Sequence, residues 1–267
     1  MRSMLRYMGV VVVIVATAAI ASAAGMAEAD TFYEEELGRA TRYVVSAGSV
    51  DVSIRPADGE ARVEARLHED RELIVTRDGD TARIAVQGAV VMSFGSLNER
   101  VDLYVPPGSA ITIDTGSGDL DLERLEVDEL RVSGGSADVS LSTIQGPVQV
   151  ETGSGDQTYR DVTGRLEAVA SSGDIELDSV AGPVTLGTSS GDITGHDVRL
   201  DGDLTITTGS GDVDLALDHA ERDLTFDLRA GTGDLRVNRI RSEDELGFGD
   251  GPITVRATSG SGDQTYR

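Results

Sequence analysis

A glycine–aspartate turn that returns at nearly constant spacing dominates this sequence. A short apolar run, a Ser/Gly turn, an Asp and a second apolar run follow one another, as in the segment from Gly146 to Gly195. The aspartates that close the turns are Asp119, Asp138, Asp156, Asp174, Asp192, Asp212, Asp234 and Asp263. By subtraction, their separations are 19, 18, 18, 18, 20, 22 and 29 residues. A period near twenty residues predicts a fold in which each unit stacks on the one before it.

Five positions in each repeat are typically apolar. Two precede the turn, such as Val184 and Leu186, and three follow the Asp at offsets of one, three and six, such as Ile175, Leu177 and Val180. A spacing of two residues places side chains on one face of a strand. Because a single unit cannot bury that face alone, the pattern predicts a parallel β-solenoid, or β-helix, with coils of about 18–20 residues.

The residues before the repeats alternate less regularly. Short alternating runs are separated by turn signals such as Asp58-Gly59 and Asp78-Gly79, which favour tight hairpin-like turns. We therefore expect an all-β, single-domain protein. Its predicted parts are a signal peptide at 1–29, an irregular N-terminal β cap with the first coils at 30–110, and the solenoid repeats at 111–267.

Two glycine series mark the predicted corners of each coil. Before the Asp, we expect glycine to supply a positive φ, and Gly135 to take that role where Ala137 replaces the usual glycine. The second corner carries Gly146-Pro147, Gly164, Gly182-Pro183, Gly202 and Gly251-Pro252. Proline fits a corner because no ladder hydrogen bond is donated there.

The last repeats depart from the regular spacing. The segment between Arg241 and Gly251 is interpreted as a bulge loop at a corner, with a ligand-contacting loop as the alternative. The final residues, 260–267, repeat residues 153–160 identically and are interpreted as an end cap. Gln157 and Gly195 occupy positions that are apolar in other repeats.

Composition excludes several classes of function. The formal net charge is −24, and all 23 basic residues are arginine. Such a chain is repelled by nucleic-acid phosphates and anionic lipid, so we expect no nucleic-acid partner. Cysteine is absent, which excludes disulfides, a thiol nucleophile and a thiolate metal site.

The first residues have the pattern of an export signal. Arg2 and Arg6 precede an apolar run over 10–20, and small-residue sites follow at 21–23 and 27–29. The run is short for a spanning helix. We expect cleavage near Ala29 and no membrane association afterwards, with a retained anchor as the alternative. The predicted location is exported: periplasmic, cell-surface or extracellular.

The column of turn aspartates is the one candidate site. Two like charges ~4.8 Å apart repel by about 0.9 kcal/mol in water, so stacked aspartates need hydrogen bonds, splaying or bridging cations. Calcium is the natural cation for these oxygens. The predicted calcium ligands are Asp119, Asp138, Asp156, Asp174, Asp192, Asp212 and Asp234. The half-turn repeat of a calcium-binding β-roll is absent, because Arg165 and Pro183 stand nine residues after Asp156 and Asp174. A role of the Asp in forming the turn is the alternative to calcium binding.

No other cofactor is expected, and no residue is assigned a catalytic role. The repeated T-G-S-G-D turn followed by alternating apolar residues resembles a bacterial family of adhesin-like β-solenoids of unknown function. It is also similar to the head domains of autotransporter adhesins. The resemblance covers about residues 42–267 and implies no catalytic residues. We expect a non-catalytic adhesin-like or scaffold protein of the cell envelope that binds a surface protein or glycan. A carbohydrate-active enzyme and a self-assembling structural solenoid are the alternative hypotheses.

Overall fold

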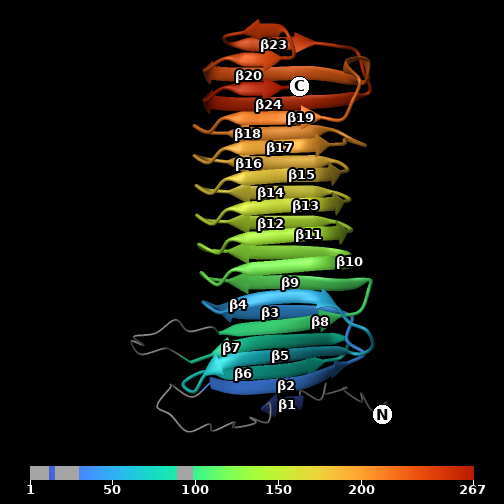
Figure 1. The fold of residues 1–267 in the computed structure, drawn as a ribbon, viewed down its shortest axis with the longest axis vertical. Helices are drawn as coiled ribbons and strands as arrows, with labels where there is room; N and C mark the ends of the chain where they lie inside the picture. Colours follow the sequence, from blue (N-terminus) through green and yellow to red (C-terminus); the bar gives the residue numbers. More distant parts are fainter. Residues whose placement is uncertain (1–11, 16–29, 89–98) are drawn as a thin grey trace, which may run out of the picture.

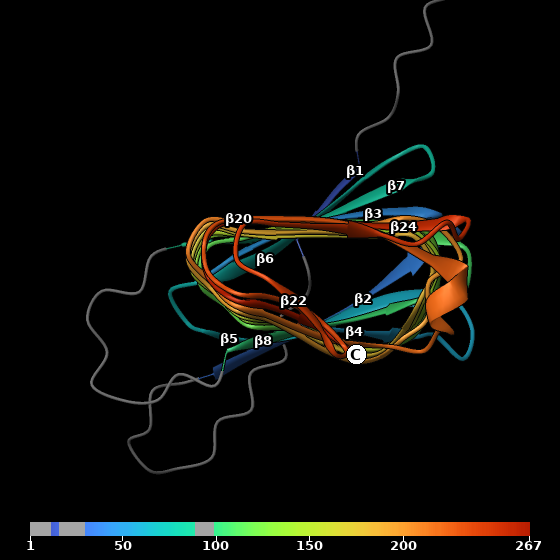
Figure 2. The ribbon, with the colours of Figure 1, turned by 90° about the horizontal axis from the view of Figure 1, so that it is seen from above.

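The computed structural model describes residues 12–15, 30–88 and 99–267, and only the backbone of residues 12–15 and 30. Within these ranges the chain forms a 25-stranded sheet and a short 3-10 helix. Figure 1 shows the strands stacked along the long axis of the molecule. Figure 2, seen along that axis, shows the sheet winding around a flattened interior like a barrel. The predicted signal peptide lies almost wholly outside the described residues.

The strands of the first third are β1 (Val12–Val15), β2 (Asp30–Gly38), β3 (Arg42–Gly48), β4 (Asp51–Pro56), β5 (Ala61–His68), β6 (Glu72–Asp78), β7 (Thr81–Gln87) and β8 (Arg100–Val105). The central strands are β9 (Ser109–Thr115), β10 (Leu120–Gly134), β11 (Val139–Gln145), β12 (Val148–Thr152), β13 (Gln157–Thr163), β14 (Leu166–Ala170), β15 (Ile175–Ala181), β16 (Val184–Thr188), β17 (Ile193–Val198), β18 (Leu204–Thr208) and β19 (Val213–Leu217). The last elements are η1 (Glu221–Asp223), β20 (Leu224–Thr232), β21 (Leu235–Val237), β22 (Ile240–Ser242), β23 (Glu245–Phe248), β24 (Ile253–Ser261) and β25 (Gln264–Tyr266).

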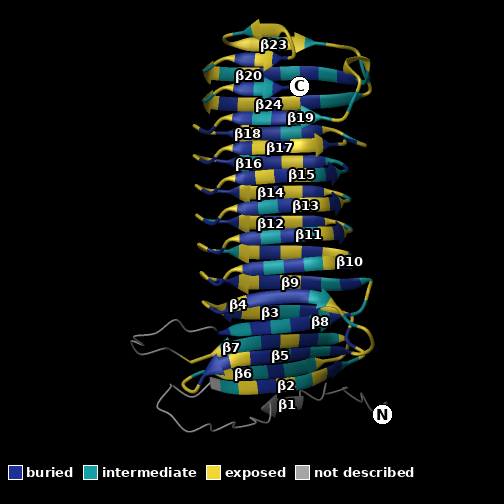
Figure 3. Cartoon of the chain, in the orientation of Figure 1, coloured by how far each residue is buried: buried dark blue, intermediate teal, exposed yellow. Residues whose placement is uncertain are grey.

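Central strands alternate between two faces of the flattened barrel. Strands β12, β14, β16 and β18 pair in parallel on one face, called face A. Strands β11, β13, β15, β17 and β19 pair in parallel on the other, called face B. The long strand β10 belongs to both, because its start pairs with β11 and its end with β12. Apolar side chains from both faces fill the interior, as the alternating burial in Figure 3 shows.

The predicted class of a parallel β-solenoid with an irregular N-terminal cap is wrong for this chain. The protein is all-β, but its sheet is mixed and barrel-like. In the first third, regular antiparallel pairs join β1 to β6, β6 to β7, β2 to β5 and β5 to β8. Near the other end, β20 pairs antiparallel with β23 and β21 with β22. Apolar alternation has the same period in parallel and antiparallel strands, so it could not reveal this mixture.

Strands from both ends of the chain are interleaved with earlier or later ones. Strand β3 lies between β7 and β9, and β4 between β8 and β10. Likewise, β24 lies between β18 and β20, and β25 between β19 and β21. The predicted end cap at 260–267 is therefore wrong, because this repeat is enclosed on both sides. The interpretation of 241–251 as a corner loop is also wrong. It contains β23, whose Phe248 ring stacks on that of Phe226 at 5.1 Å.

A column of left-handed residues explains the apolar offsets of one, three and six in five repeats, those that follow Asp119, Asp138, Asp156, Asp174 and Asp192. In strict alternation the third apolar residue would fall at offset five. The residue at that offset instead adopts positive φ, which turns the next side chain inward: Val180, for example, is fully buried after Ser179 at φ 58°. Non-glycine residues with positive φ in the described chain are Arg124, Thr143, Asp161, Ser179, Asp197 and Asn238. Asn238 differs from the others because it lies four residues after Asp234, and Ile240, at offset six in that repeat, is exposed.

The glycine before each turn Asp is required by close stacking, and the positive φ predicted for it is wrong in the central repeats. A Cβ on Gly173 would lie 2.0 Å from the carbonyl oxygen of Gly155, one repeat away. Positive φ instead occurs in the second series, for example 129° at Gly164. Gly135, for which the sequence predicts a special backbone conformation, is also required by close stacking. A Cβ on Gly135 would lie 2.6 Å from the carbonyl oxygen of Gly116.

Candidate functional site

The turn aspartates form a continuous hydrogen-bonded column, called the Asp ladder. In each step the backbone N–H of one Asp donates to Oδ1 of the Asp in the adjacent repeat. The N–H of Asp156 donates to Asp138 at 2.9 Å, and that of Asp174 donates to Asp156 at 2.9 Å. In spatial order the ladder contains Asp51, Asp119, Asp138, Asp156, Asp174, Asp192, Asp212, Asp263 and Asp234.

Sequence reasoning found most of this column but missed its first member and the order of its last two. Asp51 accepts from the N–H of Asp119 at 3.0 Å. The signal was present, because Ser49-Val50-Asp51-Val52 has the Ser-x-Asp-apolar order of a turn, with valine in the glycine position. Asp234 follows Asp212 in the predicted site, but Asp263 lies between them because of the inserted last repeat.

The carboxylates of the Asp ladder have a structural role, because they hold neighbouring repeats together through hydrogen bonds. One oxygen of each accepting Asp accepts a hydrogen bond from a backbone N–H at the corner of the sheet. These hydrogen bonds stabilise the charged carboxylates and so offset the repulsion between them that the sequence predicts. In the ranges that the structure describes, no group of three or more His, Cys, Asp or Glu side chains has an arrangement that could hold a metal ion. The second oxygen of each Asp has no assigned partner in the ladder, and calcium binding stays a prediction.

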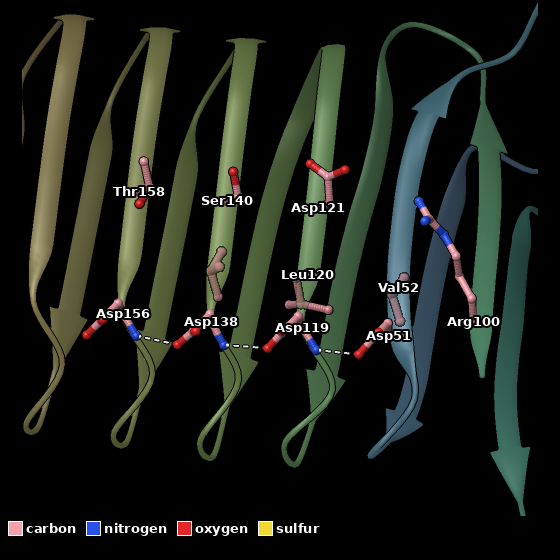
Figure 4. A pocket seen from close by; sticks show the side chains of 11 residues that line it. Asp51, Val52, Arg100, Asp119, Leu120, Asp121, Asp138, Ser140, Asp156 and Thr158 are labelled. Carbon is pink, nitrogen blue, oxygen red and sulfur yellow. Dashed lines mark hydrogen bonds between the residues drawn. The ribbon is translucent and has the colours of Figure 1, made fainter. Parts of the chain in front are cut away.

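An open groove of about 440 Å³ runs along the start of the ladder. Figure 4 shows two rows of side chains there: the ladder aspartates and, farther along the same strands, Asp121, Ser140 and Thr158. The second row is in register across β10, β11 and β13. Arg100 lines the groove too, but its Nε donates to Asp102 at 2.8 Å. The groove thus presents carboxylate and hydroxyl oxygens on a flat strand surface.

Comparison with known protein families assigns the chain. Residues 41–266 match the family described as Toastrack DUF4097, and this match covers the Asp ladder from end to end. The chain belongs to the Toastrack family. None of the curated proteins compared with it matches. The resemblance to adhesin-like families is supported only at this coarser level, and no match bears on autotransporter head domains.

Solved structures similar to this Toastrack chain are remote in sequence. A candidate adhesin from Bacteroides fragilis has 12% identity and a TM-score of 0.43, over 89% of this chain and 97% of that one. A candidate lipid-binding protein from Parabacteroides distasonis has 10% identity and a TM-score of 0.43, over the same shares. A candidate cell adhesion protein from Clostridium sporogenes has 9% identity and a TM-score of 0.29, over 89% and 98%. Similarity this low carries no argument about activity.

A buried polar network explains one departure of the Toastrack repeats from the apolar pattern. Gln157 is 1% exposed, and its Nε2 donates to Thr152 Oγ1 at 2.7 Å and to the carbonyl oxygen of Val169 at 2.8 Å. Its Oε1 accepts from the Tyr159 hydroxyl at 2.6 Å. A polar side chain is tolerated in the core here because its hydrogen bonds are made inside the protein.

The identical residues of the last repeat build a second copy of this network. Gln264 Nε2 donates to Ser259 Oγ and to the carbonyl oxygen of Arg229, both at 2.9 Å, and the Tyr266 hydroxyl donates to Gln264 Oε1 at 3.4 Å. Burial raises the pKa of the Tyr159 hydroxyl and that of Tyr266 well above the ordinary value of tyrosine. Both phenols are therefore held neutral in the core, and the Gln-Thr-Tyr motif is a packing device of this Toastrack chain.

Proposed function

We propose that the protein is a non-catalytic, adhesin-like or scaffold protein exported to the cell envelope, where it binds a surface protein or glycan. The binding surface in this proposal is the central part of face A. The Toastrack match supports the fold and family, and the adhesin-like role rests on the surface chemistry described next. Within the described residues, no helix has the length and apolar character needed to cross a membrane.

The observation that carries the proposal is an uncharged patch on face A of a strongly acidic chain: the outward residues of β16 and β18, and Val169 beside them on β14, carry no charge. Across β12, β14, β16 and β18, one outward row in register contains Gln149, Glu167, Thr185 and Thr205. The parallel row contains Glu151, Val169, Gly187 and Thr207. Val169 is 39% exposed, and it is one of three large apolar side chains of the described chain that are exposed to at least this extent. Protein interfaces are depleted of charge at their centres, and this surface has that character.

The carboxylates of the chain favour binding over hydrolysis. A glycosidase needs two carboxyl groups as acid and base on either side of a substrate. The stacked carboxylates here accept hydrogen bonds from the backbone of the neighbouring repeat, which fixes them along the corner of the sheet. The outward rows instead offer side chains at a regular spacing, one position per repeat, which suits an extended partner.

The experiment is a binding assay between the purified full chain and isolated cell envelopes. The double variant Thr185→Arg/Val169→Arg places two charges on face A. The matched control, Thr163→Arg/Thr194→Arg, places two arginines at exposed positions of face B and changes the net charge by the same amount. We expect the face A variant to lose binding and the control to keep it. Equal binding by both variants would refute face A as the surface, and release of soluble sugar from the envelopes would refute the non-catalytic role.

A further inference from the structure

A cluster of arginines lies around the β21–β22 hairpin, near the end of the stack where β20 and β23 lie in Figure 1. An open hollow of about 550 Å³ is lined there by Glu221, Arg236, Asn238, Arg239, Ile240 and Arg267. Three of these six side chains are cationic and one, Glu221, is anionic, in a chain whose net charge is −24. The hollow is thus a local reversal of the protein's charge.

The hairpin that carries the cluster has an unfavourable pairing of charges. Arg236 on β21 is the direct antiparallel partner of Arg241 on β22. Like charges directly opposite one another destabilise a strand pair, and here the pair contains only three residues on each strand. The positive charge of this hairpin therefore does not stabilise the pairing of its two strands. Arg241 does not line the hollow, so an anion bound there would offset this repulsion through Arg236.

The three lining arginines are held to different extents. The Nε of Arg236 donates to the carbonyl oxygen of Asn238 at 3.2 Å, which orients its guanidinium group. Arg267 is tethered by an ion pair from its Nη1 to Asp214 at 2.7 Å. Arg239, at the hairpin turn, is exposed and forms no ion pair with any part of the chain that the structure describes. The hollow thus combines two positioned guanidinium groups with one that is free to close on a ligand.

We propose that this hollow is a binding site for a single oxyanion group, a phosphate, sulfate or carboxylate, carried by a small ligand. The planar fork of arginine donors matches such groups and can bind them through two parallel hydrogen bonds. The exposed Ile240, at 39% of its surface, provides an apolar contact for the body of the ligand beside the charged group.

The negative net charge of the protein favours a small anionic ligand over a long polyanion. A long polyanion would approach the remaining acidic surface and be repelled by it. Among the residues that line the hollow, a ligand with one anionic group meets a single carboxylate side chain, that of Glu221. The site is independent of the binding surface proposed on face A, because it lies at the end of the stack and can be tested with small anions alone.

The test is calorimetric titration of the full chain with sodium phosphate, sodium sulfate and sodium galacturonate at constant ionic strength, with galactose as the neutral comparison. The variant Arg236→Gln/Arg239→Gln removes two charges from the hollow. The matched control, Arg160→Gln/Arg165→Gln, removes two exposed arginines that make no ion pair with the described residues. Circular dichroism and thermal unfolding of both variants verify that each remains folded.

We expect at least one of the three anions to bind the wild-type chain and the control equally, and galactose not to bind. The hollow variant should bind that anion about ten-fold more weakly or worse, which is the loss of one charge-assisted hydrogen bond. Which anions bind identifies the group. If none of the anions binds, or if the hollow variant and the control lose affinity equally, the proposal is wrong and the arginines act only through overall charge.

Discussion

Replacement of Asp156 separates the two opposing contributions of the Asp ladder to stability. Its Oδ1 accepts the N–H of Asp174, while its charge lies one strand spacing from the two neighbouring ladder carboxylates. At ~4.8 Å, each like-charge pair costs about 0.9 kcal/mol in water, and two neighbours cost about 1.7 kcal/mol. A hydrogen bond to a charged acceptor contributes about 1.5–3 kcal/mol, and a neutral one about 1 kcal/mol.

The two substitutions at this position have different expected results. Asp156→Asn keeps an acceptor oxygen and removes the charge, so the free energy of unfolding should rise by about 0.5 kcal/mol at low salt, the sum of relieved repulsion and a weaker hydrogen bond. Asp156→Ala also removes the acceptor and should be about 1 kcal/mol less stable than Asp156→Asn. Asp201→Asn, an exposed carboxylate with no assigned hydrogen bond to the described residues, is the control for net charge.

Urea unfolding followed by circular dichroism, at low salt and at about 1 M sodium chloride, measures both contributions. At ~1 M salt the Debye length falls to about 3 Å, so the repulsion between ladder carboxylates is screened. The gain from Asp156→Asn should then become a loss of about 0.5–2 kcal/mol, the difference between a charged and a neutral acceptor, while the difference between the Asn and Ala variants remains. Equal stability of those two variants at both salt concentrations would refute the ladder as a hydrogen-bonding device.

Four further predictions test other parts of the fold. Gln157→Leu should lower the free energy of unfolding by about 1–3 kcal/mol because it strands the hydroxyl of Tyr159, and the double variant with Tyr159→Phe should recover much of that loss in urea unfolding. Thr143→Asn should raise the thermal midpoint, since Asn adopts the left-handed conformation found there, φ 57°, more readily than a β-branched residue; an unchanged or lower midpoint would contradict this. Gly173→Ala should fail to fold or unfold at much lower urea, because its Cβ would lie 2.0 Å from a carbonyl oxygen. Burial raises the pKa of Tyr159 and that of Tyr266, so above pH ~10 the unfolded chain loses these protons at a lower pH than the folded chain, and the free energy of unfolding should fall. The phenolate absorbance of these two residues should appear only when the protein unfolds. Ionisation of either residue in the folded protein would contradict this prediction.

The repeat period and the inward positions were accessible from the sequence, because both depend on local alternation. Ile175, Leu177 and Val180 are buried as their spacing predicts. The cause of the offset of six was not accessible. It depends on left-handed backbone at Ser179 and its equivalents, and these residues share no side-chain type that marks a positive φ.

The direction and order of strand pairing also required the structure. Alternation around Asp78-Gly79 is compatible with a hairpin, and β6 and β7 do form one. No local signal states that β24 enters between β18 and β20, because its residues match the other repeats. The same insertion changed the candidate site, since it placed Asp263 beside Asp212 and displaced Asp234 to the end. Calcium binding by this column stays a prediction, and calorimetric titration with calcium chloride measures it.

The antiparallel strands explain how a stack of near-identical repeats ends at a defined length. A parallel strand at the end of a stack presents free backbone groups to the next identical repeat, in this molecule or another. Here β23 turns back on β20 and β22 on β21, and Phe248 covers Phe226. An added repeat would therefore meet an edge with reversed strand direction and a different hydrogen-bond pattern. The feature that makes the fold mixed is thus the one that opposes end-to-end growth. It also places the arginine hairpin beside the last full repeat, where the hollow is open to solvent and to a ligand.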